Sequence, residues 1–145
     1  MISAIVLTYN EERHLPACLA SLQWADEIVV LDSGSHDQTV SIAQAAQARV
    51  VHHPFTHFGE QREVALRLAS HAWVFFVDAD ERVPPALAEE VQQVVKMKPI
   101  HHPNRPPLGG GCLVATSFGA KKFATVAGHL IISCVFCVSK PLIMI

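Results

Sequence analysis

Residues 73–81 read W-V-F-F-V-D-A-D-E, a run of large apolar side chains followed by a short acidic cluster. The run from Ala72 to Val77 has the length and the aromatic and β-branched composition of a strand that is buried on both faces. Such strands belong to parallel sheets, whose two faces are both covered by helices. Asp78 and Asp80 follow the strand directly, so the sequence places two carboxylates where ligands bind in these sheets.

The chain before this stretch repeats the same order of buried strand and helix. Short β-branched apolar runs alternate with segments whose apolar residues recur at helical spacing. The predicted strands are residues 3–8, 27–31, 49–52 and 72–77, and the predicted helices are residues 11–22, 37–48, 59–70 and 84–96. Ser35 is expected to cap the second helix, and Pro84 to occupy the first turn of the fourth. Four buried strands alternating with helices predict an α/β domain with a mainly parallel sheet.

The charges divide the chain into two unlike parts. A net charge of −2 over 145 residues excludes a strongly basic nucleic-acid binder. All 13 Asp and Glu lie at or before Glu90, whereas the residues after it carry six Lys and Arg. We expect residues 1–96 to form the folded part. We expect residues 97–145 to be an irregular, poorly packed tail, because no helical or alternating pattern links them to the first part.

No segment predicts export or a membrane span. The apolar start Ile2–Leu7 is too short for a secretory signal and runs into Glu11. The longest apolar run, Leu130–Val138, is well short of the roughly 20 residues that cross a bilayer. The four Cys are expected to be reduced thiols. These features together favour a cytoplasmic protein.

Polar side chains follow three of the four predicted strands. The clusters are T-Y-N-E at residues 8–11, D-S-G-S at 32–35 and D-A-D-E at 78–81. Asp78 and Asp80 suit a hard cation such as Mg²⁺ or Mn²⁺, which takes one or two protein carboxylates and adds phosphates and water. Asp32 can accept a hydrogen bond from the ring N–H of a base. Taken singly, D-A-D also suits a solvated turn and D-S-G-S a helix-capping loop, but three clusters at one sheet edge predict a ligand site.

Four stretches of the chain resemble the successive motifs of family 2 glycosyltransferases. They are A-I-V-L-T-Y-N-E-E at residues 4–12, V-L-D-S-G-S-H-D-Q-T at 30–39, F-G-E-Q-R at 58–62 and F-V-D-A-D-E at 76–81. The motifs occur in the family's order and spacing, and the resemblance covers about residues 2–95. It is nearest to the branch that adds glucose to the inner core of bacterial lipopolysaccharide.

This resemblance implies a GT-A fold with a Rossmann-like nucleotide-sugar-binding half. The implied reaction is an inverting transfer of a sugar, expected to be glucose, from a UDP-sugar with a divalent metal, Mg²⁺ or Mn²⁺. The implied site residues are Thr8, Tyr9, Glu11 and Asp32 around the uracil and ribose, Arg62 at the diphosphate, and Asp78 and Asp80 as the D-x-D pair on the nucleotide sugar and the metal. The implied acceptor is a lipopolysaccharide core or similar glycan, and a lipid-linked acceptor would bring peripheral contact with the inner membrane. No nucleic-acid partner is expected.

One part of the family's machinery has no counterpart in this sequence. An inverting transfer needs a general base for the acceptor hydroxyl, and in this family a carboxylate later in the domain supplies it. No Asp or Glu follows Glu90, so no catalytic base is assigned. Another reading frame of the codons for residues 111–138 permits a stretch that resembles the family's second half. We therefore hypothesise a frameshift between about Glu90 and Gly111, which leaves a truncated chain with weak or no transfer.

Two other functions are compatible with parts of this pattern. The first is a non-catalytic remnant that still binds a nucleotide sugar. The second is a phosphatase of the haloacid dehalogenase type, which also carries D-x-D after a strand and uses the first Asp as nucleophile. In such phosphatases the motif follows the first strand, whereas here it follows the fourth. A phosphatase would also leave the clusters at residues 8–11 and 32–35 unexplained.

Overall fold

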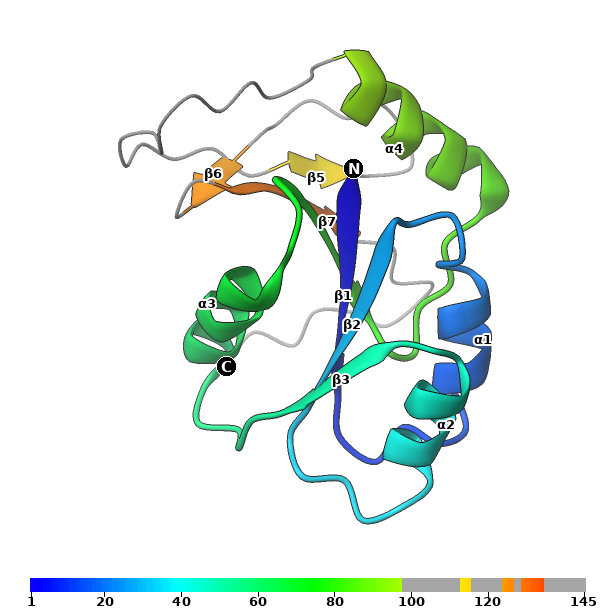
Figure 1. The fold of residues 1–145 in the computed structure, drawn as a ribbon, viewed down its shortest axis with the longest axis vertical. Coiled ribbons are helices and arrows are strands. Elements are labelled where there is room, and N and C mark those ends of the chain that lie inside the picture. The colour runs from blue at the N-terminus through cyan, green and yellow to red at the C-terminus, as the bar shows by residue number, and fades with distance from the viewer. Residues whose placement is uncertain (98–112, 116–123, 127–128, 135–145) are drawn as a thin grey trace, which may run out of the picture.

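The computed structural model describes residues 1–97, 113–115, 124–126 and 129–134 (Figure 1). Its elements are β1 (Ile2–Thr8), α1 (Leu15–Ala20), β2 (Glu27–Asp32), α2 (Thr39–Ala45), β3 (Arg49–His52), α3 (Phe58–Leu68), β4 (Trp73–Asp78), α4 (Pro85–Met97), β5 (Leu113–Ala115), β6 (Ala124–Val126) and β7 (His129–Cys134). The strand order is β3-β2-β1-β4-β7-β5, with β6 paired to β7. All pairs are parallel except the pair between β6 and β7. The predicted α/β fold with a mainly parallel sheet is therefore confirmed.

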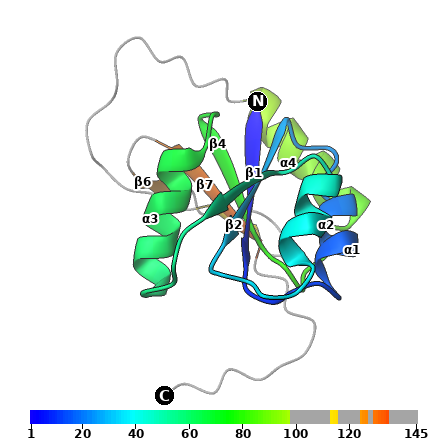
Figure 2. The same cartoon turned by 60° about the horizontal axis from the view of Figure 1, so that its bottom comes forward.

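Helices cover both faces of this sheet. Helices α1, α2 and α4 lie on one face and α3 lies on the other (Figure 2). Alternate residues of β4 enter the two cores: Phe75 and Val77 face the first group, and Val74 and Phe76 face α3. Full burial of a side chain such as Phe75 contributes about 1.5–3 kcal/mol. Among the residues described above, no helix is both long enough and apolar enough to cross a membrane.

The first two helices are shorter than their sequence patterns predict. Helix α1 begins only at Leu15, whose N–H donates to the Glu11 carbonyl at 2.9 Å. The predicted cap on α2 was wrong: this helix begins at Thr39, and the Ser35 hydroxyl donates instead to the Asp32 carboxylate. The N-cap position is Gln38, and Asp37 before it accepts a hydrogen bond from the Thr39 N–H through its Oδ1 at 2.9 Å. Ser35 therefore belongs to the loop that organises Asp32.

The tail contributes strands where the sequence predicted no regular element. Strand β7 pairs in parallel with β4, from Trp73 opposite Leu130 to Phe76 opposite Ser133. Its apolar, β-branched run suits a strand that has a neighbour on each side, and β4 consequently does not form an edge of the sheet. The Pro-rich and Gly-rich stretch at residues 98–112 lies outside the described residues. The domain boundary at residue 96 and the frameshift stay predictions.

Hydrogen bonds to Glu27 link four segments of the chain at the amino ends of the strands. Its carboxylate accepts hydrogen bonds from the Ser3 hydroxyl at 2.6 Å and from the Ser70 N–H and hydroxyl at 3.0 and 2.9 Å. Arg49 adds two more, from Nε at 3.1 Å and Nη2 at 2.8 Å. Burial disfavours the charged form, but these hydrogen bonds outweigh it and lower the Glu27 pKa from 4.5 to about 2. The charged carboxylate thus stabilises the fold.

We predict that Glu27→Gln lowers the free energy of unfolding at pH 7 by about 1–3 kcal/mol, because the charge-assisted bonds are lost. The folded-state pKa lies below the ordinary value of 4.5, so the stabilisation is present above pH 4.5 and is lost as the pH falls toward 2. Urea denaturation across this pH range should show the difference between wild type and variant shrinking with acid. Glu89→Gln, at an exposed position of α4, is the matched control. A pH-independent difference would contradict the ionic role.

Candidate functional site

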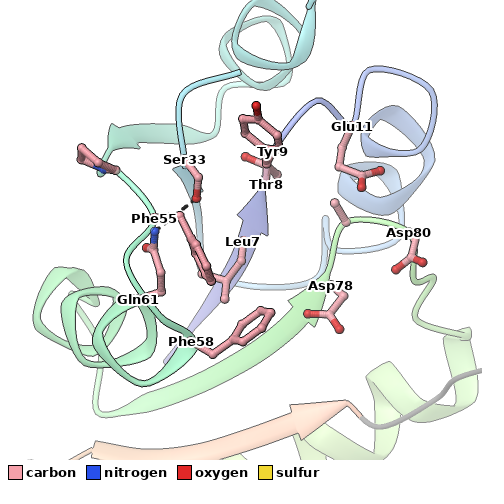
Figure 3. Close-up of a pocket in the computed structure, with 12 residues that line it drawn as sticks. Leu7, Thr8, Tyr9, Glu11, Ser33, Phe55, Phe58, Gln61, Asp78 and Asp80 are labelled. Carbon is pink, nitrogen blue, oxygen red and sulfur yellow. Dashed lines mark hydrogen bonds between the residues drawn. The ribbon is translucent and has the colours of Figure 1, made fainter. Parts of the chain in front are cut away.

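A cavity of about 740 Å³ opens at the carboxyl ends of the parallel strands. The register places Thr8 of β1 opposite Asp32 of β2, and Leu7 opposite Asp78 of β4, so the loops after these strands meet. The cavity is lined by Leu7, Thr8, Tyr9, Glu11, Ser33, Pro54, Phe55, Phe58, Gln61, Asp78, Ala79 and Asp80 (Figure 3). Five of the seven residues predicted for the site therefore share one cavity.

The carboxylates of Asp78 and Asp80 lie together on one side of this cavity, opposite Ser33 and Gln61 (Figure 3). Burial raises the pKa of Asp78, and the neighbouring Asp80 charge raises it further. The charge of Arg62 acts in the opposite direction but does not cancel these effects. The pair therefore carries a repulsion that a bound cation would relieve.

The loop that carries this pair is held by helix α1. The Cys18 thiol donates to the Asp78 carbonyl at 3.6 Å, and the Val83 N–H donates to the Ser21 hydroxyl at 3.1 Å. Within the loop, the Asp78 N–H donates to Glu81 Oε2 at 3.1 Å. Burial raises the pKa of Cys18 to about 12, so this thiol stays protonated and serves as a donor. The backbone of the loop that carries the two carboxylates is thus held by contacts within the protein.

The donor set fits a hard divalent cation. Mg²⁺ and Mn²⁺ prefer oxygen ligands, and Mg²⁺ is usually held by one or two carboxylates together with substrate phosphates and water. Asp78 and Asp80 supply two such carboxylates on the wall of an open cavity. Among the described residues, no group of three or more His, Cys, Asp or Glu is placed to hold a metal. A cation here would therefore depend on a phosphate ligand to complete its shell.

Asp32 does not line the cavity but lies behind it, only 1% exposed. Its Oδ2 accepts the N–H groups of Gly34 and Ser35, both at 3.0 Å. Its Oδ1 lies 2.5 Å from the Ser35 hydroxyl and 3.3 Å from that of Thr8, and His52 Nδ1 lies 3.3 Å from Oδ2. Burial opposes the charge, but these bonds keep the pKa of Asp32 below its ordinary value. Gly34, at φ +100°, permits the tight turn that aims both N–H groups at one oxygen.

Arg62 also lies outside the lining of the cavity. Its guanidinium carbon sits 5.6 Å from the centroid of the Phe76 ring, a cation–π contact on the α3 side of the sheet. The side chain is exposed, and its charge reaches Asp78. Arg62 therefore lies near the acidic pair without lining the cavity.

Seven of the twelve lining residues were not predicted as site residues, and three of them, Gln61, Phe55 and Phe58, make notable contacts. Gln61 is 2% exposed, and its Nε2 donates to the Ser33 hydroxyl and to the His53 carbonyl, both at 3.2 Å. Phe55 and Phe58 form an edge-to-face pair with centroids 5.1 Å apart, although both side chains are at least half exposed. Phe58 and Gln61 both stand in the F-G-E-Q-R motif, which was the available signal for them. Phe55 carried none, because an exposed aromatic residue in a loop has no periodicity.

Residues 3–100 match the family model described as glycosyl transferase family 2. The chain belongs to this family. LpsC of Rhizobium meliloti (strain 1021), a lipopolysaccharide core biosynthesis glycosyltransferase, is 35% identical over 99 residues, which cover 65% of this chain and 37% of LpsC. An uncharacterized glycosyltransferase of Rickettsia bellii (strain RML369-C) is 34% identical over 94 residues, which cover 64% of this chain and 32% of the relative. The chain thus spans about a third of the length of these relatives.

Two solved structures share the fold. S. aureus TarS 1-349 in complex with UDP superposes with a TM-score of 0.58 at 28% identity, over 78% of this chain and 34% of that one. Glucosyl-3-phosphoglycerate synthase from Mycobacterium tuberculosis, in complex with Mn²⁺, UDP and glucosyl-3-phosphoglycerate, gives 0.55 at 26% identity, over 79% and 43%. The predicted GT-A half of a family 2 member is confirmed.

We predict that Asp80→Asn lowers the pKa of Asp78 toward its ordinary value of 3.8, because the neighbouring charge that disfavours ionisation is removed. NMR titration of the Asp78 carboxyl carbon measures this directly. Asp26→Asn, at the opposite end of the strands, should leave the Asp78 titration unchanged. An Asp78 pKa that is the same in wild type and in Asp80→Asn would show that the two carboxylates do not interact.

Proposed function

We propose that this chain binds a UDP-sugar together with Mg²⁺ or Mn²⁺ in the described cavity, as the nucleotide half of an inverting glycosyltransferase. The observation that carries the proposal is the Asp78–Asp80 pair at the end of β4, which faces a cavity that residues of the T-Y-N-E and D-S-G-S loops also line. Support comes from the two similar structures, which hold UDP in one case and Mn²⁺ with UDP in the other.

The residues divide into a base end and a phosphate end. Thr8 and Tyr9 lie near Ser33 of the D-S-G-S loop, whereas Glu11 lines the cavity on the side of Asp80 (Figure 3). We assign all three residues to the uracil and its ribose. Asp32 supports this end from behind, and its 3.3 Å contact with Thr8 is among its longest. If the Thr8 hydroxyl gave up this contact, Asp32 Oδ1 could accept a hydrogen bond from an N–H of the base.

The phosphate end is formed by the acidic pair and by Arg62. Asp78 and Asp80 would hold the cation, which when bound supplies Lewis-acid neutralisation of the departing diphosphate. Arg62 lies close enough to Asp78 to influence its pKa. A swing of this exposed side chain off the Phe76 ring would bring its guanidinium to the phosphates. Arg62 and the cation would then together neutralise the negative charge of the diphosphate.

The proposed whole reaction is transfer of a sugar, most simply glucose, to a lipopolysaccharide core or similar glycan. The support is the similarity to LpsC, whose name states a role in lipopolysaccharide core biosynthesis. Because such an acceptor is lipid-linked, we place the reaction at the cytoplasmic face of the inner membrane, through peripheral contact.

A second candidate is a nucleotide-sugar binder without turnover. It is favoured by the absence of any Asp or Glu among residues 91–145, where the family's general base is expected. We propose that transfer by this chain alone is weak or absent. The two candidates are separated by following UDP release from UDP-glucose in the presence of a glycan acceptor. Release above the level of an Asp80→Asn sample would exclude the non-catalytic binder.

We predict that UDP binds the purified chain in the presence of Mn²⁺, and that Asp80→Asn weakens this binding at least about tenfold because a cation ligand is lost. Isothermal titration calorimetry with and without Mn²⁺ measures the effect. Glu89→Gln on α4 is the control and should bind as wild type does. Folded wild-type chain that fails to bind UDP would overturn the proposed function.

A further inference from the structure

Two loops at the cavity are joined by reciprocal hydrogen bonds around Asn10. The Asn10 N–H donates to the Ser35 hydroxyl at 2.9 Å, and the His36 N–H donates to Asn10 Oδ1 at 2.8 Å. These residues are 25 and 26 positions apart in sequence, so the bonds connect the loop after β1 to the loop after β2. We call this pair of bonds the Asn10 clasp.

Further hydrogen bonds join the two residues after Asn10 to residues 37–39 at the start of α2. The Glu11 N–H donates to the Thr39 hydroxyl at 2.8 Å. The Glu12 N–H donates to Asp37 Oδ2 at 3.1 Å, and Glu12 Oε2 in turn accepts the Gln38 N–H at 3.1 Å. The two loops are therefore joined by hydrogen bonds from each of Asn10, Glu11 and Glu12.

Asn10 also has an unusual backbone conformation. Its φ is +55°, in the left-handed region that Gly and Asn tolerate far better than other residues. It stands between Tyr9 and Glu11, which both line the cavity, whereas Asn10 itself does not. The turn at Asn10 thus determines how the two lining residues are directed.

The same clasp reaches the buried carboxylate. The Ser35 hydroxyl that accepts the Asn10 N–H donates its own hydrogen to Asp32 Oδ1, at 2.5 Å. The Ser33 N–H, in the same loop, donates to the Thr8 carbonyl at 2.9 Å. A movement of Asn10 would therefore disturb both Tyr9 on one loop and the setting of Asp32 on the other.

We infer that Asn10 is a positioning residue of the nucleotide site, which holds Tyr9 and Glu11 in register with the Asp32–Ser35 loop before the ligand enters. The inference rests on the proposed function, because it assigns Asn10 a role toward the nucleotide. Loops that are already ordered lose less conformational entropy when the ligand binds. Asn10 acts through its neighbours and makes no ligand contact of its own.

Three substitutions separate the two properties of Asn10. Asn10→Ala removes the oxygen acceptor and disfavours the positive φ. Asn10→Gly permits the positive φ but lacks the acceptor, whereas Asn10→Asp keeps an oxygen acceptor and tolerates this conformation. Ser41→Ala is the matched control, because the exposed Ser41 hydroxyl bonds to Gln38 on the outer side of α2.

Titration calorimetry with UDP and Mn²⁺ should show Asn10→Ala binding about three- to tenfold more weakly, with Asn10→Asp within about twofold of wild type and Asn10→Gly between them. Thermal melts by circular dichroism establish that each variant is folded at the titration temperature. Equal affinity in folded wild type and Asn10→Ala would overturn the positioning role and leave the proposed function intact. Failure of wild type to bind UDP would overturn the proposed function, and the role of Asn10 toward UDP with it.

A second measurement reports on the loop directly. The chain contains a single Tyr, so 3-fluorotyrosine incorporation places one fluorine label on Tyr9. In the absence of ligand, Asn10→Ala should shift or broaden this resonance, whereas Asn10→Asp should restore the wild-type signal. A resonance that is unchanged in Asn10→Ala would show that Asn10 does not direct Tyr9, and would overturn the inference whatever the UDP affinities are.

Discussion

The parallel pairing of β1 with β2 and β4 is the constraint on which the rest of the structure depends. Parallel strands must be joined by crossovers, so helices cover both faces and every strand end with the same polarity lies at one edge. The register brings Thr8, Asp32 and Asp78 to that edge from segments that are distant in sequence. The amino ends, at the opposite edge, are joined by the hydrogen bonds of Glu27.

The two edges use carboxylates in opposite ways. Glu27 and Asp32 are surrounded by donors, which lower their pKa values and make the charge a stabilising part of the fold. Burial and the neighbouring Asp80 charge both disfavour the ionised form of Asp78, so its pKa is raised. A fold that keeps such a pair in place stores electrostatic repulsion in an open cavity. This contrast separates the carboxylates that hold the loops from those available to a cation.

The predictions from sequence succeeded where periodicity or a motif indicated the structure. They failed where contacts between distant or competing residues determine the position of a side chain. Alternation of buried strands and helices predicted the sheet, and D-A-D-E after β4 predicted the acidic pair. Ser35 was expected to cap a helix, but its hydroxyl bonds to Asp32, a choice between two nearby partners that spacing cannot make. Phe55 reaches the cavity only because the loop after β3 folds back toward β1.

The sequence by itself determined the fold class, the family and the polar clusters at the strand ends, because these follow from local runs of residues. Tertiary structure alone decided which polar groups face the cavity and which form hydrogen bonds within the protein instead. Asp32 lies behind the wall because neighbouring N–H and hydroxyl groups saturate it, and Gln61 lines the cavity because Ser33 and His53 orient its amide. It also placed β7 beside β4, since a strand's partner depends on which edge of the sheet is free as well as on the strand's own residues.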